Sequence, residues 1–252
     1  MKSRHFWKPG LAVLALTLLS AHVAPSVDDN NRYLKLTPLG DRVRIAYTVF
    51  FGEIPGAQER RGIDANHDGQ ISDAEANTFG QRLAGQVAAN VELEVDGKRT
   101  PLTWQTLDVG MGTPDVAAGA FSVDLVAYPC LATARGRHRL QLRDKMVLTN
   151  PGETEVKVED SPGVSIDHAR IGPADDPSYD YKFVGAGGPL ADDGLDLQYN
   201  AGPKAPVTAD GTCKADAPGS GSKLPWLLAA GGLVVIAAAV AFVLLRRRRA
   251  VS

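Results

Sequence analysis

The sequence predicts a mainly β domain, an antiparallel β-sandwich-like fold with a helical insertion, followed by one C-terminal transmembrane helix. Three observations support this prediction. Short segments in which apolar and polar residues alternate recur along the chain, one longer segment has apolar residues at helical spacing, and residues 224–245 contain no charged side chain. A chain of 252 residues is long enough for one domain with appendages at both ends.

The N-terminal segment has the three-part plan of a secretory signal peptide. Three basic residues within the first eight precede an apolar run from Leu11 to Leu19, and small residues follow. We predict residues 1–21 as the signal peptide, cleaved after Ala21. Cleavage after Ser26 also fits, and an uncleaved anchor is the alternative. The domain of residues 22–199 is then extracytoplasmic, in the periplasm or on the cell surface.

Several short segments have the period-two pattern of strands that bury one face. In Arg42–Phe51 the alternation places five apolar side chains on one face. Residues 91–95 repeat the pattern, and Asp96-Gly97 then supplies the positive φ angles of a tight hairpin turn into residues 98–102. Further strands are predicted at residues 121–125, 138–142 and 156–158. Strands separated by turn residues indicate an antiparallel sandwich.

One segment breaks this rhythm. Between Ser72 and about Asn90, the apolar residues Phe79, Leu83 and Val87 recur at four-residue spacing. This spacing is typical of the apolar stripe of an amphipathic helix. We therefore predict a helix inserted into the β-rich domain.

Two later stretches carry weaker patterns. Residues 160–200 are rich in Asp, Gly and Pro, and two interpretations stay open: irregular strands of the same sandwich, or a loosely packed extension. Residues 200–223 have the Pro, Gly, Ala and Ser content of a flexible linker. A linker of this length has an r.m.s. reach of about 27 Å, which lets the domain stand off a membrane.

The apolar segment 224–245 is predicted to be a transmembrane helix. At about 1.5 Å per residue it spans roughly 33 Å, enough for a hydrocarbon core of about 30 Å. Four arginines, Arg246 to Arg249, follow directly, and they place the tail 246–252 in the cytoplasm. An apolar span before an arginine cluster also resembles the C-terminal sorting signals of bacterial surface proteins, in which the segment is processed.

Charge is distributed unevenly along the chain. All 29 acidic residues lie between residues 22 and 223, whereas seven of the 27 basic residues lie outside that range. The outer domain is therefore acidic. Such a domain repels nucleic acid and attracts cations, so no nucleic-acid partner is expected.

The chain has two cysteines, Cys130 and Cys213, both on the side of the membrane where disulfides persist. Two interpretations stay open. The cysteines form a bridge, or Cys130 is a buried core residue and Cys213 a free or modified thiol.

Residues 64–75 read Asp-Ala-Asn-His-Asp-Gly-Gln-Ile-Ser-Asp-Ala-Glu. This segment resembles the twelve-residue loop of the EF-hand family at each informative position. The resemblance implies a Ca²⁺ site, because calcium takes six to eight oxygen ligands and such a loop supplies them as it wraps the ion. The implied ligands are side-chain oxygens of Asp64, Asn66 and Asp68, the backbone carbonyl of Gln70, Ser72 directly or through water, and both carboxylate oxygens of Glu75.

An ordinary turn is the alternative for this loop. Clusters of Asp, Asn and Gly also form turns, and Ser72-x-x-Glu75 is a capping box with or without metal. Pro55 and Gly56 leave room for only two turns of helix before Asp64, and the sequence contains no second loop of this type. A structural calcium site is therefore predicted rather than a sensor that opens a helix pair.

A wider resemblance covers about residues 22–160. Asn31-Arg32-Tyr33, the run from Glu53 to Glu59, the calcium loop and residues 91–97 resemble the extracytoplasmic segment that precedes the membrane helices of bacterial nickel/cobalt transporter-like proteins. The several membrane helices of those transporters are absent from this sequence, so transport does not follow. The resemblance implies an envelope domain whose partner is a membrane transporter or another envelope protein.

Taken together, these features predict a calcium-binding, membrane-anchored binding or accessory module of the bacterial envelope. One alternative is an accessory subunit for nickel or cobalt uptake, with His22 as a ligand at the mature N-terminus. The other is a hydrolase. Because the sequence contains no HExxH, CxxC, Walker, GxSxG or GxGxxG motif, an enzyme is not expected.

Overall fold

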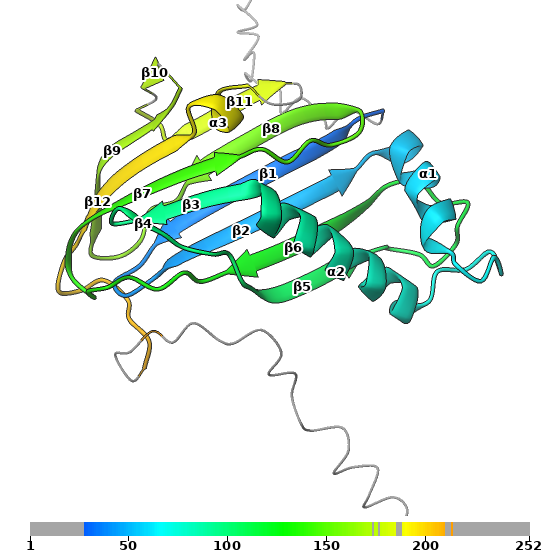
Figure 1. The fold of residues 1–252 in the computed structure, drawn as a ribbon, viewed down its shortest axis with the longest axis horizontal. Coiled ribbons are helices and arrows are strands. Elements are labelled where there is room, and N and C mark those ends of the chain that lie inside the picture. The colour runs from blue at the N-terminus through cyan, green and yellow to red at the C-terminus, as the bar shows by residue number, and fades with distance from the viewer. Residues whose placement is uncertain (1–27, 173, 176, 185–187, 210–212, 214–252) are drawn as a thin grey trace, which may run out of the picture.

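The computed structural model describes residues 28–172, 174–175, 177–184, 188–209 and 213. They form a mainly β domain of two six-stranded sheets (Figure 1). The strands of the first sheet, in spatial order, are β11 (Asp180–Val184), β8 (Pro151–Val158), β1 (Asn30–Pro38), β2 (Val43–Phe51), β6 (Phe121–Ala127) and β5 (Trp104–Gly110). Those of the second sheet are β10 (Ala174–Asp175), β9 (Val164–Ile171), β12 (Leu195–Ala201), β7 (Gly136–Asp144), β3 (Val91–Val95) and β4 (Lys98–Arg99).

The predicted β-rich, two-layered class is confirmed, and the antiparallel prediction needs one correction. β1 and β8 pair in parallel, with Leu34 opposite Val156, so the first sheet is mixed. The two strands lie far apart in the sequence. β8 follows β7, which belongs to the second sheet, so the chain crosses from one sheet to the other just before β8 begins. No hairpin turn therefore forces them to run in opposite directions.

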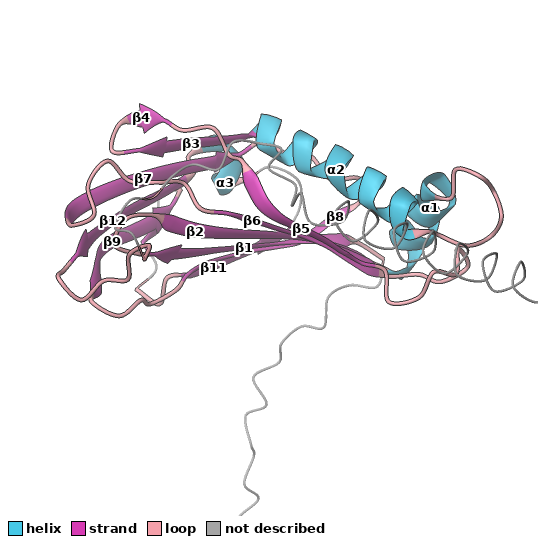
Figure 2. Ribbon diagram, turned by 90° about the horizontal axis from the view of Figure 1, so that it is seen from below, coloured by secondary structure: helices cyan, strands magenta, loops and turns pink. Residues whose placement is uncertain are grey.

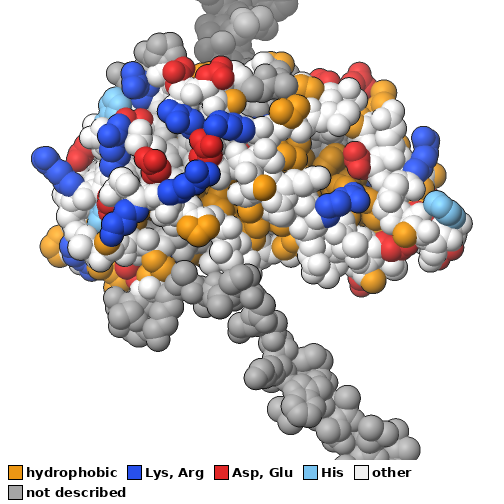
Figure 3. Space-filling view, viewed as in Figure 1, with side chains coloured by type: hydrophobic (Ala, Val, Ile, Leu, Met, Phe, Trp, Pro, Cys, Tyr) orange, Lys and Arg blue, Asp and Glu red, His pale blue; other side chains and the backbone are white. Residues whose placement is uncertain are grey.

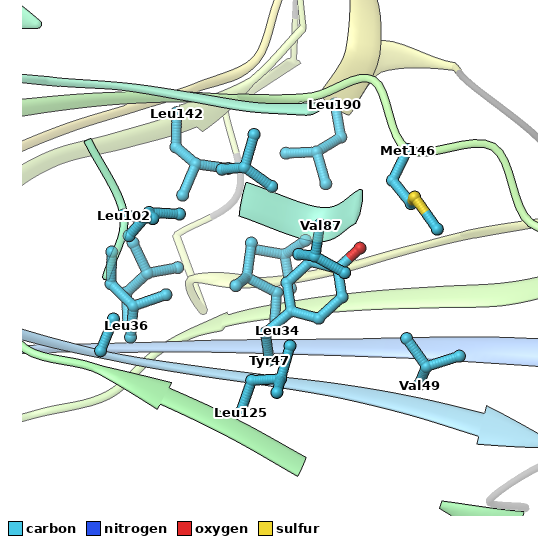
Figure 4. Close-up of a cluster of buried hydrophobic side chains, with 14 of the residues drawn as sticks. Leu34, Leu36, Tyr47, Val49, Val87, Leu102, Leu125, Leu142, Met146 and Leu190 are labelled. Carbon is cyan, nitrogen blue, oxygen red and sulfur yellow. The ribbon is translucent and has the colours of Figure 1, made fainter. Parts of the chain in front are cut away.

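The strands form where alternate side chains enter the space between the sheets. In β2 each odd-numbered residue from Val43 to Phe51 is buried, as the period-two pattern predicts. The predicted strand 98–102 is shorter, because β4 ends at Arg99 before Pro101, which has no N–H to donate to a ladder. Figure 4 shows the resulting core, in which Val87 lies among side chains of both layers, including Leu34, Tyr47, Leu142 and Leu190.

Two helices extend the second layer. α1 (Glu53–Ile63) follows β2, and α2 (Asp73–Asn90) runs directly into β3, while a short α3 (Pro189–Asp192) precedes β12. Figure 2 shows α2 in line with the second sheet, so that the two together cover one face of the longer first sheet. The predicted helix 72–90 is thus confirmed, with Ser72 as its N-cap.

Aromatic side chains attach the first half of α2 to the first sheet. The rings of Phe51 and Phe121 stack with centroids 4.5 Å apart, and Phe79 of α2 packs edge-on against both, at 5.7 Å. Farther along, the indole N–H of Trp104 donates to the Ala84 carbonyl at 3.0 Å. The helix that leaves the predicted calcium loop is therefore fixed to the sheet.

The stretch from residue 160 onward belongs to the sandwich. Of the two interpretations, irregular strands are correct, because β9, β11 and β12 all pair with strands of the two sheets. Residues 200 and 201 still belong to β12, and Thr208 donates hydrogen bonds to the Asp41 carboxylate from its backbone and its hydroxyl. The first ten residues of the predicted linker are therefore packed on the domain.

A disulfide joins Cys130 to Cys213, with Cα atoms 5.5 Å apart, which decides between the two interpretations of the cysteines. The bridge fastens the chain to the loop after β6, at the end of the sandwich opposite α1 (Figure 1). Within the described ranges no helix is both long and apolar enough to cross a membrane. The predicted signal peptide, His22 and the predicted helix 224–245 lie outside the described residues.

Candidate metal centre

The predicted loop connects α1 to α2. α1 has 11 residues, about three turns rather than the two predicted. The reason is that Pro55 lies in the first turn, where a missing N–H breaks no intrahelical bond. The loop then reverses direction at His67 and Gly69, whose φ angles are 59° and 84°. A β-carbon resists this left-handed conformation, which accounts for the glycine.

Asp64 organises the first half of the loop from its buried position at the end of α1. Only 4% of its surface is exposed. Its Oδ2 accepts a hydrogen bond from the Gly69 amide at 3.0 Å, and its Oδ1 accepts one from the Asp68 amide at 3.2 Å. The first predicted ligand thus lies inside the turn that residues 65–69 make around it.

The next predicted ligands form a chain of short hydrogen bonds. Asn66 Oδ1 accepts from the Asp68 amide at 3.0 Å, and Asp68 Oδ1 accepts from the Gln70 amide at 2.8 Å. The Asn66 amide group also donates to Asp68 Oδ2 at 2.9 Å. The Asp68 amide thus donates to an oxygen of Asp64 and to one of Asn66, which places these two side-chain oxygens close together.

Glu75 connects the two ends of the loop. Its Oε1 accepts from the Ala65 amide at 2.9 Å, while its Oε2 accepts from the hydroxyl and the amide of Ser72 at 2.7 and 2.9 Å. The Glu75 amide donates back to Ser72 Oγ at 3.3 Å, which completes the capping box. Hydrogen bonds from the Ser72 side chain and backbone hold the pKa of Glu75 at about 2, so this carboxylate is ionised at neutral pH.

A second segment, residues 111–120 between β5 and β6, lies against the loop and is called here the docking segment. The Ile71 amide donates to the Pro114 carbonyl at 2.7 Å, and the Val116 amide donates to the Gly69 carbonyl at 3.2 Å. These bonds flank an antiparallel bridge between Gln70 and Asp115. The N–H and C=O of Gln70 therefore point away from the docking segment, and the N–H donates to Asp68.

The loop's donor set fits a hard cation. All six predicted ligands offer oxygen, which suits calcium better than zinc or nickel. Within the described part of the chain, Asp64, Asp68 and Glu75 form no ion pair with a basic side chain. Their oxygens instead accept hydrogen bonds from backbone amides of the loop. The described residues include no cluster of three or more His, Cys, Asp or Glu side chains arranged to hold a metal.

Sequence reasoning missed Arg60, which is fully buried in α1. Its guanidinium donates to five backbone carbonyls of the docking segment, from Met111, Thr113, Asp115, Gly119 and Ala120. Arg60 is flanked by Glu59 and Arg61 in the sequence, a pattern typical of a solvent-exposed helix face. Only the packing of the docking segment against α1 distinguishes Arg60 from Glu59 and Arg61.

The two helices around the loop also form one wall of a cleft of about 510 Å³. Phe79 and Leu83 of α2 and Met146 and Leu148 of the opposite loop give it an apolar lining. Glu59, Arg82 and Lys145 line it as well and make much of its surface polar. Figure 3 shows hydrophobic side chains gathered on this face of the molecule, beside α2.

Another histidine, His138, lies within the predicted strand 138–142. The structure places it in β7, buried, with Nδ1 2.9 Å from Asp96 Oδ2. Its ring lies near Tyr199, with centroids 5.4 Å apart. Burial, and then the charge of Asp96, raise the pKa of Tyr199, which keeps its hydroxyl protonated.

Comparison with known proteins gives no further guidance, because no protein-family model and no curated protein matches this chain.

Proposed function

We propose that the chain binds one Ca²⁺ ion in the loop 64–75, as part of a membrane-anchored extracytoplasmic binding or accessory module of the bacterial envelope. One observation carries the proposal. Three carboxylates, those of Asp64, Asp68 and Glu75, stand in one short loop with no basic partner among the described residues. Negative charge of this kind attracts a cation and is stabilised by one.

In the proposed complex the ligands from Asp64 to Ser72 keep their places in the loop, and Glu75 changes its contacts. Asp64, Asn66 and Asp68 bind through side-chain oxygens, and Gln70 binds through its backbone carbonyl. Ser72 binds directly or through water. Glu75 gives up its contacts with Ala65 and Ser72 and grips the ion with both oxygens, which joins α2 to the end of α1.

We propose a structural role for the ion rather than a switch. The anchoring of α2 by Phe79 and Trp104 favours a helix that stays in place when calcium leaves. Extracellular calcium modules bind at about 10⁻⁴ to 10⁻³ M. At ten times the dissociation constant, the ion adds about 1.4 kcal/mol to the free energy of unfolding.

The location outside the cytoplasm is likewise a proposal. The Cys130–Cys213 bridge supports it, because disulfides persist in oxidising compartments. The predicted signal peptide and transmembrane helix give the same orientation. The proposed partner is a transporter or another protein of the envelope, and the cleft beside α2 supports a binding role.

Calorimetric titration of Ca²⁺ into residues 27–223 tests the calcium site. Glu75→Gln removes the charge and the bidentate grip of the closing carboxylate, so we expect saturable binding in the unaltered protein and its loss in this variant. Asp73→Asn is the matched control, because it removes one exposed charge from the same helical turn without touching a ligand. Equal binding by all three proteins, or none at millimolar calcium in any of them, contradicts the proposal.

A further inference from the structure

The docking segment pairs with the middle of the loop, at the predicted ligand Gln70. Its contacts with the loop are the two backbone hydrogen bonds on either side of Gln70, one from Ile71 to Pro114 and one from Val116 to Gly69. They hold the middle of the loop extended and turn the Gln70 carbonyl away from the docking segment. The geometry of one ligand therefore depends on a segment more than forty residues away in the sequence.

Arg60 holds the docking segment in place. A guanidinium has five N–H donors in a fixed, planar arrangement, and here they meet five carbonyls. Nε donates to Gly119 at 2.9 Å, and Nη1 donates to Thr113 at 2.9 Å and to Asp115 at 3.1 Å. The side chain also lies over the Phe121 ring, with Cζ 5.5 Å from the ring centroid.

The backbone of α1 packs closely against the docking segment near this side chain. A β-carbon at Gly56 would lie 2.6 Å from the Gly119 carbonyl oxygen. The helix backbone and the docking segment are therefore in direct contact one turn before Arg60. A lysine at position 60 keeps the charge but has three donors on a flexible stem, so it leaves buried carbonyls without a partner.

We propose that Arg60 is a positioning residue that sets the calcium affinity of the loop by fixing the docking segment against it. This inference rests on the proposed calcium function. A loop that is ordered before the ion arrives loses less conformational entropy on binding, and its affinity is correspondingly higher. By linkage, calcium in the loop must stabilise the docked arrangement of residues 111–120 to the same degree.

Calcium titration of the full chain in detergent tests the first half of the proposal. We expect Arg60→Lys to raise the dissociation constant at least tenfold, and the matched control Arg61→Lys, at the exposed neighbouring position, to change it less than twofold. Both variants keep the positive charge. If Arg60 acted only through its charge, the dissociation constant of Arg60→Lys would equal that of the unaltered protein. Near-ultraviolet circular dichroism in EDTA checks that each variant is folded.

Hydrogen exchange of the unaltered protein tests the second half without a mutation. The Val116 amide lies outside the loop but donates into it, so we expect its exchange to slow about tenfold at ten times the dissociation constant. If calcium binds and Val116 exchanges at the same rate, or folded Arg60→Lys binds calcium like the control, the inference is wrong while the calcium site stands. If the unaltered chain binds no calcium, both proposals fall. If Arg60→Lys does not fold, the effect of calcium on the exchange rate of the Val116 amide decides whether the docking segment and the calcium site are coupled.

Discussion

The hydroxyl of Tyr47 in β2 donates a hydrogen bond of 2.8 Å to Oδ2 of Asp144 in β7, so a polar contact joins the two sheets through their apolar core. Arg32 of β1 reaches the same carboxylate oxygen at 2.6 Å and also donates to the Met146 carbonyl. All three side chains are buried. Asp144 Oδ1 in turn accepts from the Met146 amide at 2.8 Å, which fixes the loop bordering the cleft.

Removing the charge of Asp144 should therefore destabilise the domain strongly. Asp144→Asn leaves Arg32 as an uncompensated buried cation, at a cost of about 3 to 5 kcal/mol in the free energy of unfolding. Tyr47→Phe deletes one hydrogen bond to the same carboxylate and should cost about 1 to 3 kcal/mol. Urea unfolding of both variants measures the difference. A smaller loss for Asp144→Asn than for Tyr47→Phe contradicts this account of the cluster.

Two glycines of α2 should respond in opposite directions to the same substitution. At Gly80 a β-carbon would lie 2.6 Å from Val109 Cγ2 and 2.9 Å from Leu107 Cδ2 of β5, whereas at Gly85 it would meet nothing within 4 Å. Gly85→Ala should raise the free energy of unfolding by about 0.5 to 1 kcal/mol, because alanine favours the helix. Gly80→Ala should lower it, because the clash with β5 outweighs the same gain.

Thermal and urea unfolding of the two variants check this prediction, and each serves as the control for the other. Equal stabilisation by both alanines would mean that α2 does not approach β5 as closely as the structure shows.

The elements predicted from the sequence are those that local pattern determines. β2, β3, β6 and β7 bury alternate residues against the opposite layer, so each carries a clear period of two. β5 was not predicted: it lies at the edge of its sheet, its residues are all at least partly exposed, and its apolar alternation is limited to Leu107 and Val109. The parallel pairing of β1 with β8 depends on long-range topology and has no local signal.

The candidate site divides in the same way. Its six predicted ligands lie within twelve consecutive residues, so their spacing alone is enough to propose them. Arg60 and the docking segment act through backbone carbonyls, which every residue has, and no side-chain pattern marks them. The disulfide could be proposed from the sequence but not decided, because the distance between Cys130 and Cys213 is a property of the fold.

Reduction of the disulfide should loosen the end of the sandwich opposite the loop 64–75. The bridge spans a sequence separation of 83, and removing a native disulfide typically costs about 2 to 5 kcal/mol. We expect Cys213→Ser to unfold at lower temperature than the oxidised protein and to match the unaltered protein treated with a reductant. If the reductant also lowers the melting temperature of Cys213→Ser, its effect does not come from this disulfide.

The pair formed by Asp196 and Arg139 should make stability depend on pH. Arg139 donates to both carboxylate oxygens, at 2.9 and 2.7 Å, and this hydrogen bonding holds the pKa of Asp196 below its ordinary value of 3.8. Because the folded pKa is the lower one, the stabilisation is present above pH 3.8 and is lost as the pH falls through the folded pKa.

Arg139→Met should therefore lower the melting temperature at pH 7 and make the melting temperature fall less steeply in acid. Arg137→Met, at an exposed position on the same strand, should leave that decline unchanged. Parallel declines for the unaltered protein and Arg139→Met would assign the acid sensitivity to other carboxylates.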